Sequence, residues 1–528
     1  MRRVRLPDCR SLVMSRPLRI SRVVLIGVAV AAGLAGGPRL HAEPASPEIR
    51  PPAFAGQFYP ADPAALRAAL EGFMKDALPA RVDGPVALVV PHAGYIYSGQ
   101  IAADAYRQAA AAPVETVVIL GTNHTSGAFR RVSVYDGEGY RTPLGVARVD
   151  RDLAAALVKE GGGVFDASLH EREHSVEVQV PFVQHVFPGA AIVPVVVGRP
   201  DPESCRRFGR ALAALAAGRR VLIVASSDLS HYPERRVAAD VDRRTLEAIA
   251  GMKTDDVGDM RAGLVNLEGR GVETCACGEG PIRVAIEAAR ALGALRGTVV
   301  SYANSGDTVI GDPDRVVGYG AVAFSRGEAG ADLRALQPVA ADPAGALDAA
   351  DKKALLRLVR ETITRYLQTE TVPLPRGGSA RLLRESGAFV TLKSHGQLRG
   401  CIGRIQPAGP LLQLVGSLAL DSAFRDSRFK PVGAGELKDI EIEVSVLTPP
   451  VSVPGPDAVQ PGRDGVVLIV GDRSAVFLPQ VATEQGWSRT ELLDNLAQKA
   501  GLASGAWRDK RAKLLTFRAD VFDESLLK

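Results

Sequence analysis

Three histidines share one kind of position in the sequence. Each lies in a polar, turn-forming segment directly after a run of apolar, largely β-branched residues. They are His92 after residues 86–90, His124 after residues 116–120 and His231 after residues 221–225. Short apolar runs of this kind predict buried strands. Ligands of open α/β sheets bind in the crevice at the carboxyl ends of the strands, so we expect the three imidazoles to converge on one pocket.

A cysteine is predicted to join these histidines. Cys277 lies just before a helix predicted over residues 281–295. The positive end of the helix dipole lowers the pKa of a thiol placed there and favours the thiolate. A thiolate together with imidazoles is a donor set suited to Zn, Cu or Fe. Two acidic residues, Asp228 and Glu177, are candidates to orient imidazole N–H groups or to carry protons.

Each histidine also has a structural interpretation. A single histidine at a strand end is usually a hydrogen-bonded framework residue, but three at equivalent strand ends favour a shared pocket. His174 is a weaker candidate, because the segment around it also fits a solvated helix start. The residues therefore predict a pocket for a metal ion or a small ligand.

The elements that must position this pocket alternate along the chain. Strands are predicted at 86–90, 116–120, 191–197, 221–225, 298–302 and 317–324, with helices at 100–110, 202–217 and 281–295. Continuous apolar strands alternating with helices imply an α/β fold with a mostly parallel central sheet and helices on both faces. We expect this domain to span residues 43–327.

The second half of the chain has a different pattern. Residues 328–348 are rich in Ala, Gly, Asp and Pro and are predicted to form a linker. Residues 349–528 combine a helix at 351–367 with a hairpin at 388–403 and further short strands, which predicts a smaller α+β domain. Cys401 lies on a predicted strand beside Arg399, where a buried core thiol and a reactive thiol are the alternatives. No second ligand set accompanies Cys401, so we predict no metal there.

The first 42 residues stand apart from the rest. A basic stretch is followed by an apolar run from Val23 to about Leu34 and then by small residues, which is the order of a cleavable signal peptide. The run is shorter than the roughly 20 apolar residues that a membrane span needs. We expect a periplasmic or secreted protein without a stable membrane span, with an N-terminal membrane anchor as the alternative and Met14 as an alternative start.

Charge and cysteine content follow from this segment. It holds eight Lys/Arg and one Asp, so its removal takes the formal net charge from +5 to about −2. Nothing then indicates a nucleic-acid partner, and we expect no nucleotide cofactor. Four scattered cysteines remain, which do not make a disulfide framework. Unpaired thiols in an oxidising compartment need a reason, and metal ligation is one.

Six motifs in the first domain resemble the Memo family. They are PHAGY (91–95), GTNH (121–124), YRTPL (140–144), EHSVE (173–177), SSDLSH (226–231) and CGEGPI (277–282). The family is similar in fold to the class III extradiol ring-opening dioxygenases, in which a carboxylate takes the place of Cys277. The resemblance implies an Fe(II) or Cu ion held by His92, His124 and Cys277. It also implies that Asp228, His231 and His174 line the same pocket as catalytic residues.

Motifs in the second domain resemble the AMMECR family. They are LRGCIG (398–403), DSRF (426–429), EVSVLT (443–448) and FLPQVATEQGW (477–487). Together the two resemblances imply a fusion of the A-like and B-like components of the AmmeMemoRadiSam system, with a radical SAM protein as a partner. The predicted function is that of a metal-dependent redox or dioxygenase-like protein acting on a small molecule. The alternative is a non-catalytic metal-binding, ligand-binding or interaction scaffold.

Overall fold

The computed structural model describes residues 48–199, 201–257, 271–336, 345–376, 378–407 and 409–527. It divides into two compact units, one of Pro47–Pro449 with Ala519–Lys528 and one that contains Pro450–Arg518. The predicted signal peptide, residues 1–42, lies outside the described residues. Among the residues described, no helix combines the length and the apolar character needed to cross a membrane.

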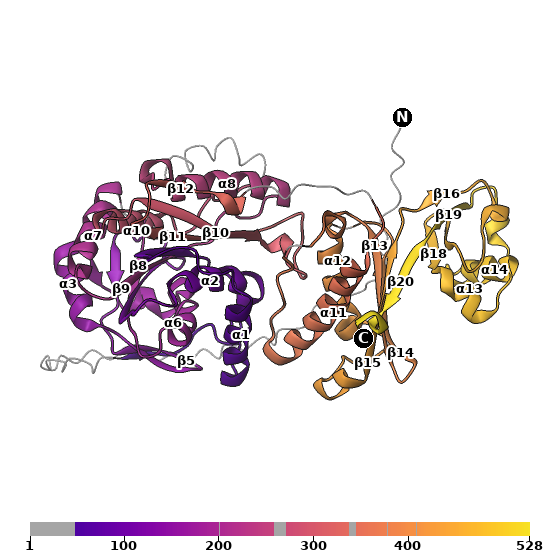
Figure 1. Ribbon diagram of the computed structural model, residues 1–528, viewed down its shortest axis with the longest axis horizontal. Helices are drawn as coiled ribbons and strands as arrows, with labels where there is room; N and C mark the ends of the chain where they lie inside the picture. Colours follow the sequence, from indigo (N-terminus) through magenta and orange to yellow (C-terminus); the bar gives the residue numbers. More distant parts are fainter. Residues whose placement is uncertain are drawn as a thin grey trace, which may run out of the picture. The chain divides into compact units, whose positions relative to one another are not determined.

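A nine-stranded sheet lies at the centre of the α/β body (Figure 1). In spatial order its strands are β12 (Gly330–Asp332), β10 (Arg296–Asn304), β11 (Gly318–Ser325), β2 (Ala87–Val90), β9 (Val221–Ser226), β3 (Thr116–Thr122), β8 (Ala191–Val197), β4 (Val132–Val134) and β7 (Val164–Phe165). Strands β2, β9, β3 and β8 run parallel, with antiparallel neighbours β11 and β4 on either side. Every residue of β2 and β3 is buried, so both faces of the sheet are covered. The predicted mostly parallel α/β fold is confirmed.

Helices flank this sheet, and a small sheet lies beside it. The helices are α1 (Pro63–Asp76), α2 (Tyr95–Ala109), α3 (Arg151–Gly161), α4 (Ser168–Glu171), α5 (His174–Glu177), α6 (Val180–Val186), α7 (Pro202–Ala216), α8 (Arg235–Ala250) and α10 (Glu279–Ala291). The small sheet contains β1 (Ile49–Arg50), β5 (Gly139–Thr142) and β6 (Gly145–Arg148). Helices α2 and α10 both pack against β2, so they bring their N-termini to the strand ends that carry the predicted site.

Two boundaries differ from the sequence prediction. Helix α2 begins at Tyr95 rather than near residue 100. Gly99 accounts for part of this, because a Cβ atom there would lie 2.7 Å from the Phe73 ring, and this close packing favours the helix despite the weak helix propensity of glycine. The predicted linker at 328–348 is wrong for its first residues. Strand β12 extends the main sheet by pairing parallel with β10, and it is too short and too rich in small residues to show a periodic pattern.

The N-terminal part of the body is fixed by a buried ion pair. Glu177 is fully buried on α5, and its carboxylate accepts hydrogen bonds from Arg50 Nη1 at 2.6 Å and from the Tyr59 hydroxyl at 2.6 Å. The backbone N–H groups of Ala53 and Phe54 also donate to it. Residues 50–59 are therefore tied to the helix that begins with His174, and they bring aromatic side chains to the site.

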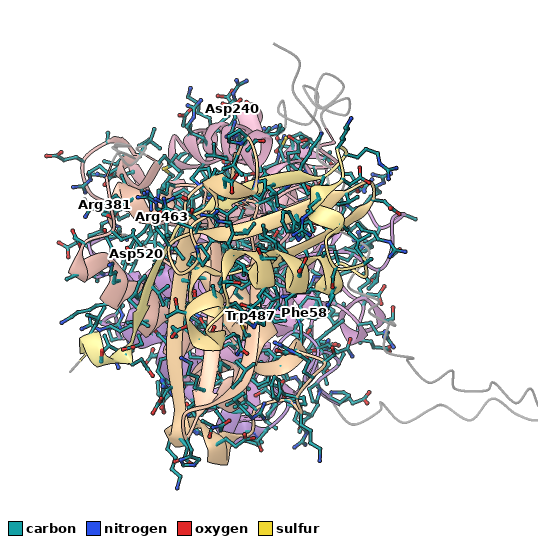
Figure 2. The ribbon with its side chains drawn as sticks, turned by 90° about the vertical axis from the view of Figure 1, so that its right-hand side faces the viewer. Phe58, Asp240, Arg381, Arg463, Trp487 and Asp520 are labelled. Carbon is teal, nitrogen blue, oxygen red and sulfur yellow. The ribbon has the colours of Figure 1, made fainter. Side chains whose placement is uncertain are left out.

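The fused half continues in the same unit with an antiparallel sheet. Its order is β14 (Gln397–Arg404), β13 (Gly387–Ser394), β15 (Ile440–Leu447) and β20 (Ala519–Asp523). The helices α11 (Ala349–Thr369) and α12 (Leu411–Leu420) share an apolar core with this sheet. Ion pairs such as Arg381–Asp351 and Lys352–Asp520 also link α11 to neighbouring segments. Arg381 and Asp520 are labelled in Figure 2.

The second unit is a separate small α+β body. It holds the antiparallel sheet β16 (Val451–Ser452), β19 (Lys513–Phe517), β17 (Gly465–Val470) and β18 (Arg473–Phe477). Its helices are α13 (Pro479–Gln485) and α14 (Arg489–Lys499). Trp487, labelled in Figure 2, packs on Phe477 with ring centroids 5.5 Å apart beside the unit's own apolar core. The predicted smaller α+β architecture of the second half is confirmed.

The Arg50–Glu177 pair predicts a large stability effect. Glu177→Gln leaves a buried guanidinium without its counter-charge, which costs about 3–5 kcal/mol. Urea unfolding followed by far-UV circular dichroism measures this. Tryptophan fluorescence does not report on the α/β body, because both tryptophans, Trp487 and Trp507, belong to the small unit.

The matched control is Glu203→Gln, which breaks an exposed i,i+3 pair with Arg206. We expect the control to change stability by less than about 1 kcal/mol. Equal effects of the two substitutions would contradict the importance of the buried pair.

Candidate metal centre

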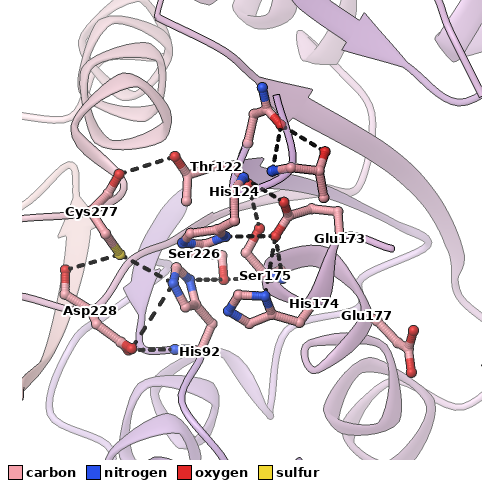
Figure 3. Close-up of polar contacts among 12 residues, drawn as sticks. His92, Thr122, His124, Glu173, His174, Ser175, Glu177, Ser226, Asp228 and Cys277 are labelled. Atoms are coloured by element: carbon pink, nitrogen blue, oxygen red, sulfur yellow. Dashed lines mark hydrogen bonds and ion pairs between the residues drawn. The ribbon is translucent and has the colours of Figure 1, made fainter. Parts of the chain in front are cut away.

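Three imidazoles lie together at the carboxyl end of the sheet (Figure 3). His92 follows β2, His124 follows β3, and His174 is the first residue of α5. One ring nitrogen of each lies within 4.8 Å of the other two. The ring centroids are 5.2 Å apart for His92–His124 and 4.4 Å apart for His124–His174. This group of nitrogen donors could hold a metal ion.

His92 is buried, and its surroundings fix its tautomer. Its Nδ1 lies 3.1 Å from Ser226 Oγ. The Ser226 hydroxyl donates its own proton to the carbonyl of Ser175 at 2.6 Å, so Ser226 Oγ must accept from His92 Nδ1–H. The lone pair of His92 therefore resides on Nε2. Burial and the neighbouring His124 lower the pKa of His92 well below its ordinary value, so the ring is neutral and the lone pair of Nε2 can bind a metal ion.

His124 is oriented by a buried carboxylate. Glu173 is fully buried, and its oxygens accept from the His124 backbone N–H at 2.7 Å and from His124 Nδ1 at 2.8 Å. Burial alone would raise the pKa of Glu173, but the hydrogen bonds and charge of His124 outweigh it and lower the pKa to about 2. Glu173 is therefore ionised, and it leaves Nε2 of His124 free to bind a metal.

His174 lies between the other imidazoles and an aromatic wall. Its ring centroid is 4.7 Å from that of Phe58 and 5.6 Å from that of Phe54. Burial, followed by the neighbouring His92 and His124, lowers the pKa of His174 to about 3, so the ring is neutral. The helix start that was the alternative interpretation is present, since His174 opens α5, but its side chain faces the pocket (Figure 3).

Cys277 lies next to His92, just before α10. Its Sγ is 3.1 Å from His92 Nε2 and 3.6 Å from the Asp228 carbonyl oxygen. The expected lowering of its pKa by the helix dipole is wrong for the metal-free protein, because burial and then the negative charge of Asp228 raise the pKa. Desolvation of a thiolate outweighs the dipole of the helix. The thiol is therefore protonated, and binding of a metal ion to the sulfur would displace this proton to solvent.

The remaining predicted residues occupy different places. Asp228 accepts from the His92 backbone N–H at 2.8 Å and so fixes the loop that carries His92. His231 is outside the three-histidine group, although Asp228 and His124 both act on its charge. Its Nε2 is buried and has no hydrogen-bond partner within the described part of the chain. Glu177 orients no imidazole, since it binds Arg50 and the N-terminal segment instead.

The sequence did not predict that Glu173 is the carboxylate that orients an imidazole. It lies in a segment with acidic residues at 171, 173 and 177, and nothing in the sequence distinguishes the one that faces the histidines. The fold does so, because α4 ends before it and its side chain caps Ser175 N–H at the start of α5.

The fold and the site define a class: an α/β protein with a group of imidazoles at its strand ends. Comparison with known proteins adds the family. The model of the Memo-like protein family matches residues 50–323, and that of the AMMECR1 family matches residues 356–522. The chain belongs to the Memo family and carries an AMMECR1 domain fused behind it. Membership of this family supports a dioxygenase-like fold.

Two relatives match about half of this chain and nearly all of their own length, and one solved structure matches a smaller share of this chain. A MEMO1 family protein of Methanopyrus kandleri is 40% identical over 291 residues, which are 53% of this chain and 99% of the relative. One of Methanothermobacter thermautotrophicus is 39% identical and covers 51% of this chain and 98% of its own length. A crystal structure of an uncharacterised Pyrococcus horikoshii protein is 38% identical, covers 32% of this chain and 89% of that one, and has a TM-score of 0.31.

The contact between Glu173 and His124 predicts an effect on metal affinity. Glu173→Gln removes the charge that holds the His124 ring in its tautomer, so affinity for Fe(II) or Cu(II) should fall about 10–100-fold. Isothermal titration of anaerobic protein measures it. Glu171→Gln, two residues away and exposed, is the matched control and should leave affinity unchanged. Equal affinity in the two variants would show that Glu173 does not orient a ligand.

Buried neutral histidines also predict how stability depends on pH. Burial lowers the pKa of His170 and His174 to about 3 and that of His92 well below its ordinary value of 6.5. The unfolded chain binds more protons than the folded protein between these values, so stability falls as the pH drops below 6.5. We expect a loss of about 1.4 kcal/mol per pH unit for each such histidine in metal-free protein.

His170→Gln tests this away from the metal site. His170 contacts Tyr140 and Ser133 rather than the other histidines. The slope of unfolding free energy against pH, between about pH 6 and pH 5, should fall by about 1 kcal/mol per pH unit, the contribution of one buried histidine. An unchanged slope would mean that His170 is not held neutral by burial.

Proposed function

We propose that His92, His124 and Cys277 hold an Fe or Cu ion, and that the protein is a metal-dependent redox or dioxygenase-like protein acting on a small organic molecule. The observation that carries this proposal is the group of three imidazoles, two of which, His92 and His124, have Nδ1 bonded to a neighbour, which leaves Nε2 to bind a metal. This arrangement suits a metal ion, because such an ion binds the lone pair of a ring nitrogen.

The chemistry of the donors supports a transition metal rather than a hard cation. Imidazole nitrogen and cysteine sulfur suit Fe, Cu and Zn, whereas Mg²⁺ and Ca²⁺ prefer oxygen. Cys277 Sγ is already 3.1 Å from the free nitrogen of His92, so the thiolate and this imidazole can share one ion with little movement. A bound Fe or Cu ion would supply Lewis acidity and one-electron chemistry.

The residues around the ligands have their own tasks in this proposal. His174 is neutral at neutral pH and stands beside the ligands, so it can accept a hydrogen bond from a substrate group such as a phenol hydroxyl and orient it. Asp228, which contacts His92, and His231, which interacts electrostatically with Asp228, are assigned to holding protons. Phe54 and Phe58 cover His174 with apolar surface, which keeps water away and gives an aromatic substrate a surface to pack on.

Metal analysis of full-length protein with ligand variants tests the proposal. We expect near-stoichiometric Fe or Cu after anaerobic loading, with metal lost in His92→Ala and in Cys277→Ser. His174→Ala should keep its metal, and so should the control His185→Ala, which changes a partly exposed histidine on α6.

Two results would contradict the proposal in different ways. Loss of metal in His174→Ala with retention in Cys277→Ser would assign the centre to three histidines instead. Protein that stays free of metal after attempted loading would overturn the metal centre itself. The pocket would then be a binding site for an organic ligand.

A further inference from the structure

A strained tyrosine follows His231 at the edge of the metal centre. Tyr232 has a φ of 72°, a left-handed conformation that is uncommon for bulky residues. Its N–H donates to the Val316 carbonyl at 2.7 Å, and the Val316 N–H donates to the Pro233 carbonyl at 2.9 Å. The surrounding backbone thus holds the strained conformation, which is typical of positions under a functional constraint.

The Arg315 guanidinium stacks on the ring of Tyr232. The Arg315 guanidinium carbon is 4.0 Å from the centroid of the Tyr232 ring, and this ring is 5.4 Å from that of His231. Both Tyr232 and Arg315 are exposed. The Tyr232 ring therefore contacts a guanidinium and also lies beside the ring of His231.

The charge of Arg315 is not neutralised by an ion pair within the described residues. Its loop contains Asp312 and Asp314, yet neither pairs with it, and Asp307 pairs with Arg235 instead. A guanidinium offers parallel N–H groups that match a carboxylate. A single unpaired guanidinium balances one negative charge, so a monoanion fits it better than a dianion does.

We infer that Arg315, held on Tyr232, recognises the carboxylate of a small aromatic acid whose other end reaches the histidines of the metal centre. This inference rests on the proposed function and adds the substrate class. The aromatic part of such a ligand would meet Phe54 and Phe58 beside His174, and the carboxylate would point to the His231 side. Arg315 is then a specificity residue rather than a catalytic one.

Two probes that differ in charge test this on the full-length protein. 4-Hydroxybenzoate and 4-methylphenol have similar size and the same phenol group, but only the first carries a carboxylate. Isothermal titration of metal-loaded protein should give tighter binding of the acid by about 3–10-fold, as expected for one partly screened charge pair. Added salt should weaken the acid selectively.

Variants of Arg315 separate charge from packing. Arg315→Gln should abolish the preference for the acid and leave 4-methylphenol binding within about 2-fold, while Arg315→Lys should keep most of it. Arg236→Gln changes another exposed arginine, on α8, and should behave as wild type.

Several results would overturn the inference. A preference for the acid that survives in Arg315→Gln, an equal loss for both probes, or no binding of either probe would each do so. Metal content is measured on the same samples and tests the proposed metal centre independently of ligand binding. If the metal is absent, the two probes are compared on metal-free protein, where the same dependence on Arg315 is expected.

Discussion

The buried carboxylate of Glu173 is the interaction on which the arrangement of the site depends. Its two oxygens accept from the backbone and the ring of His124, and also from Ser175 N–H at the start of α5. One ionised group therefore orients the His124 ring, joins the end of β3 to α5 and caps the start of α5 at His174. A buried charge of this kind is stable only because its partners are hydrogen-bonded to it.

The rest of the body brings two further segments to this point. The Arg50–Glu177 pair fixes the N-terminal segment against α5, which places Phe54 and Phe58 over His174. On the other side, Ser226 at the end of β9 and Asp228 in the loop after it hold His92, and the Asp228 carbonyl accepts from the Cys277 N–H. Three segments distant in sequence thus converge because parallel strands end at one edge of the sheet.

Much of this could be predicted from the sequence, and the exceptions have physical causes. Apolar runs identified the central strands because both faces of a parallel sheet are buried. Position after those runs placed His92 and His124 correctly at strand ends. The same rule suggested that His231 would join them, but in the structure His174 takes the third position in the group.

The failures concern tertiary contacts that no local pattern encodes. Glu173 and Glu177 are both buried acids of one short segment, and only the fold decides which of them meets an imidazole. The pKa of Cys277 depends mainly on the desolvation of the thiol, which raises it. This effect is larger than that of the helix dipole, which was the only one of the two that the sequence could indicate. Strand β12 was missed because its three residues, Gly-Ala-Asp, show no alternation of apolar and polar side chains and include no large apolar residue.

The central claim is that imidazoles and a thiolate share one metal ion at the ends of the parallel strands. X-ray absorption at the metal K-edge of the loaded, full-length protein tests it most directly, because sulfur and nitrogen ligands scatter differently. The account predicts one sulfur together with nitrogen ligands, and loss of the sulfur in Cys277→Ser. A shell of nitrogen and oxygen alone in the unaltered protein would contradict it and would assign the centre to the three histidines.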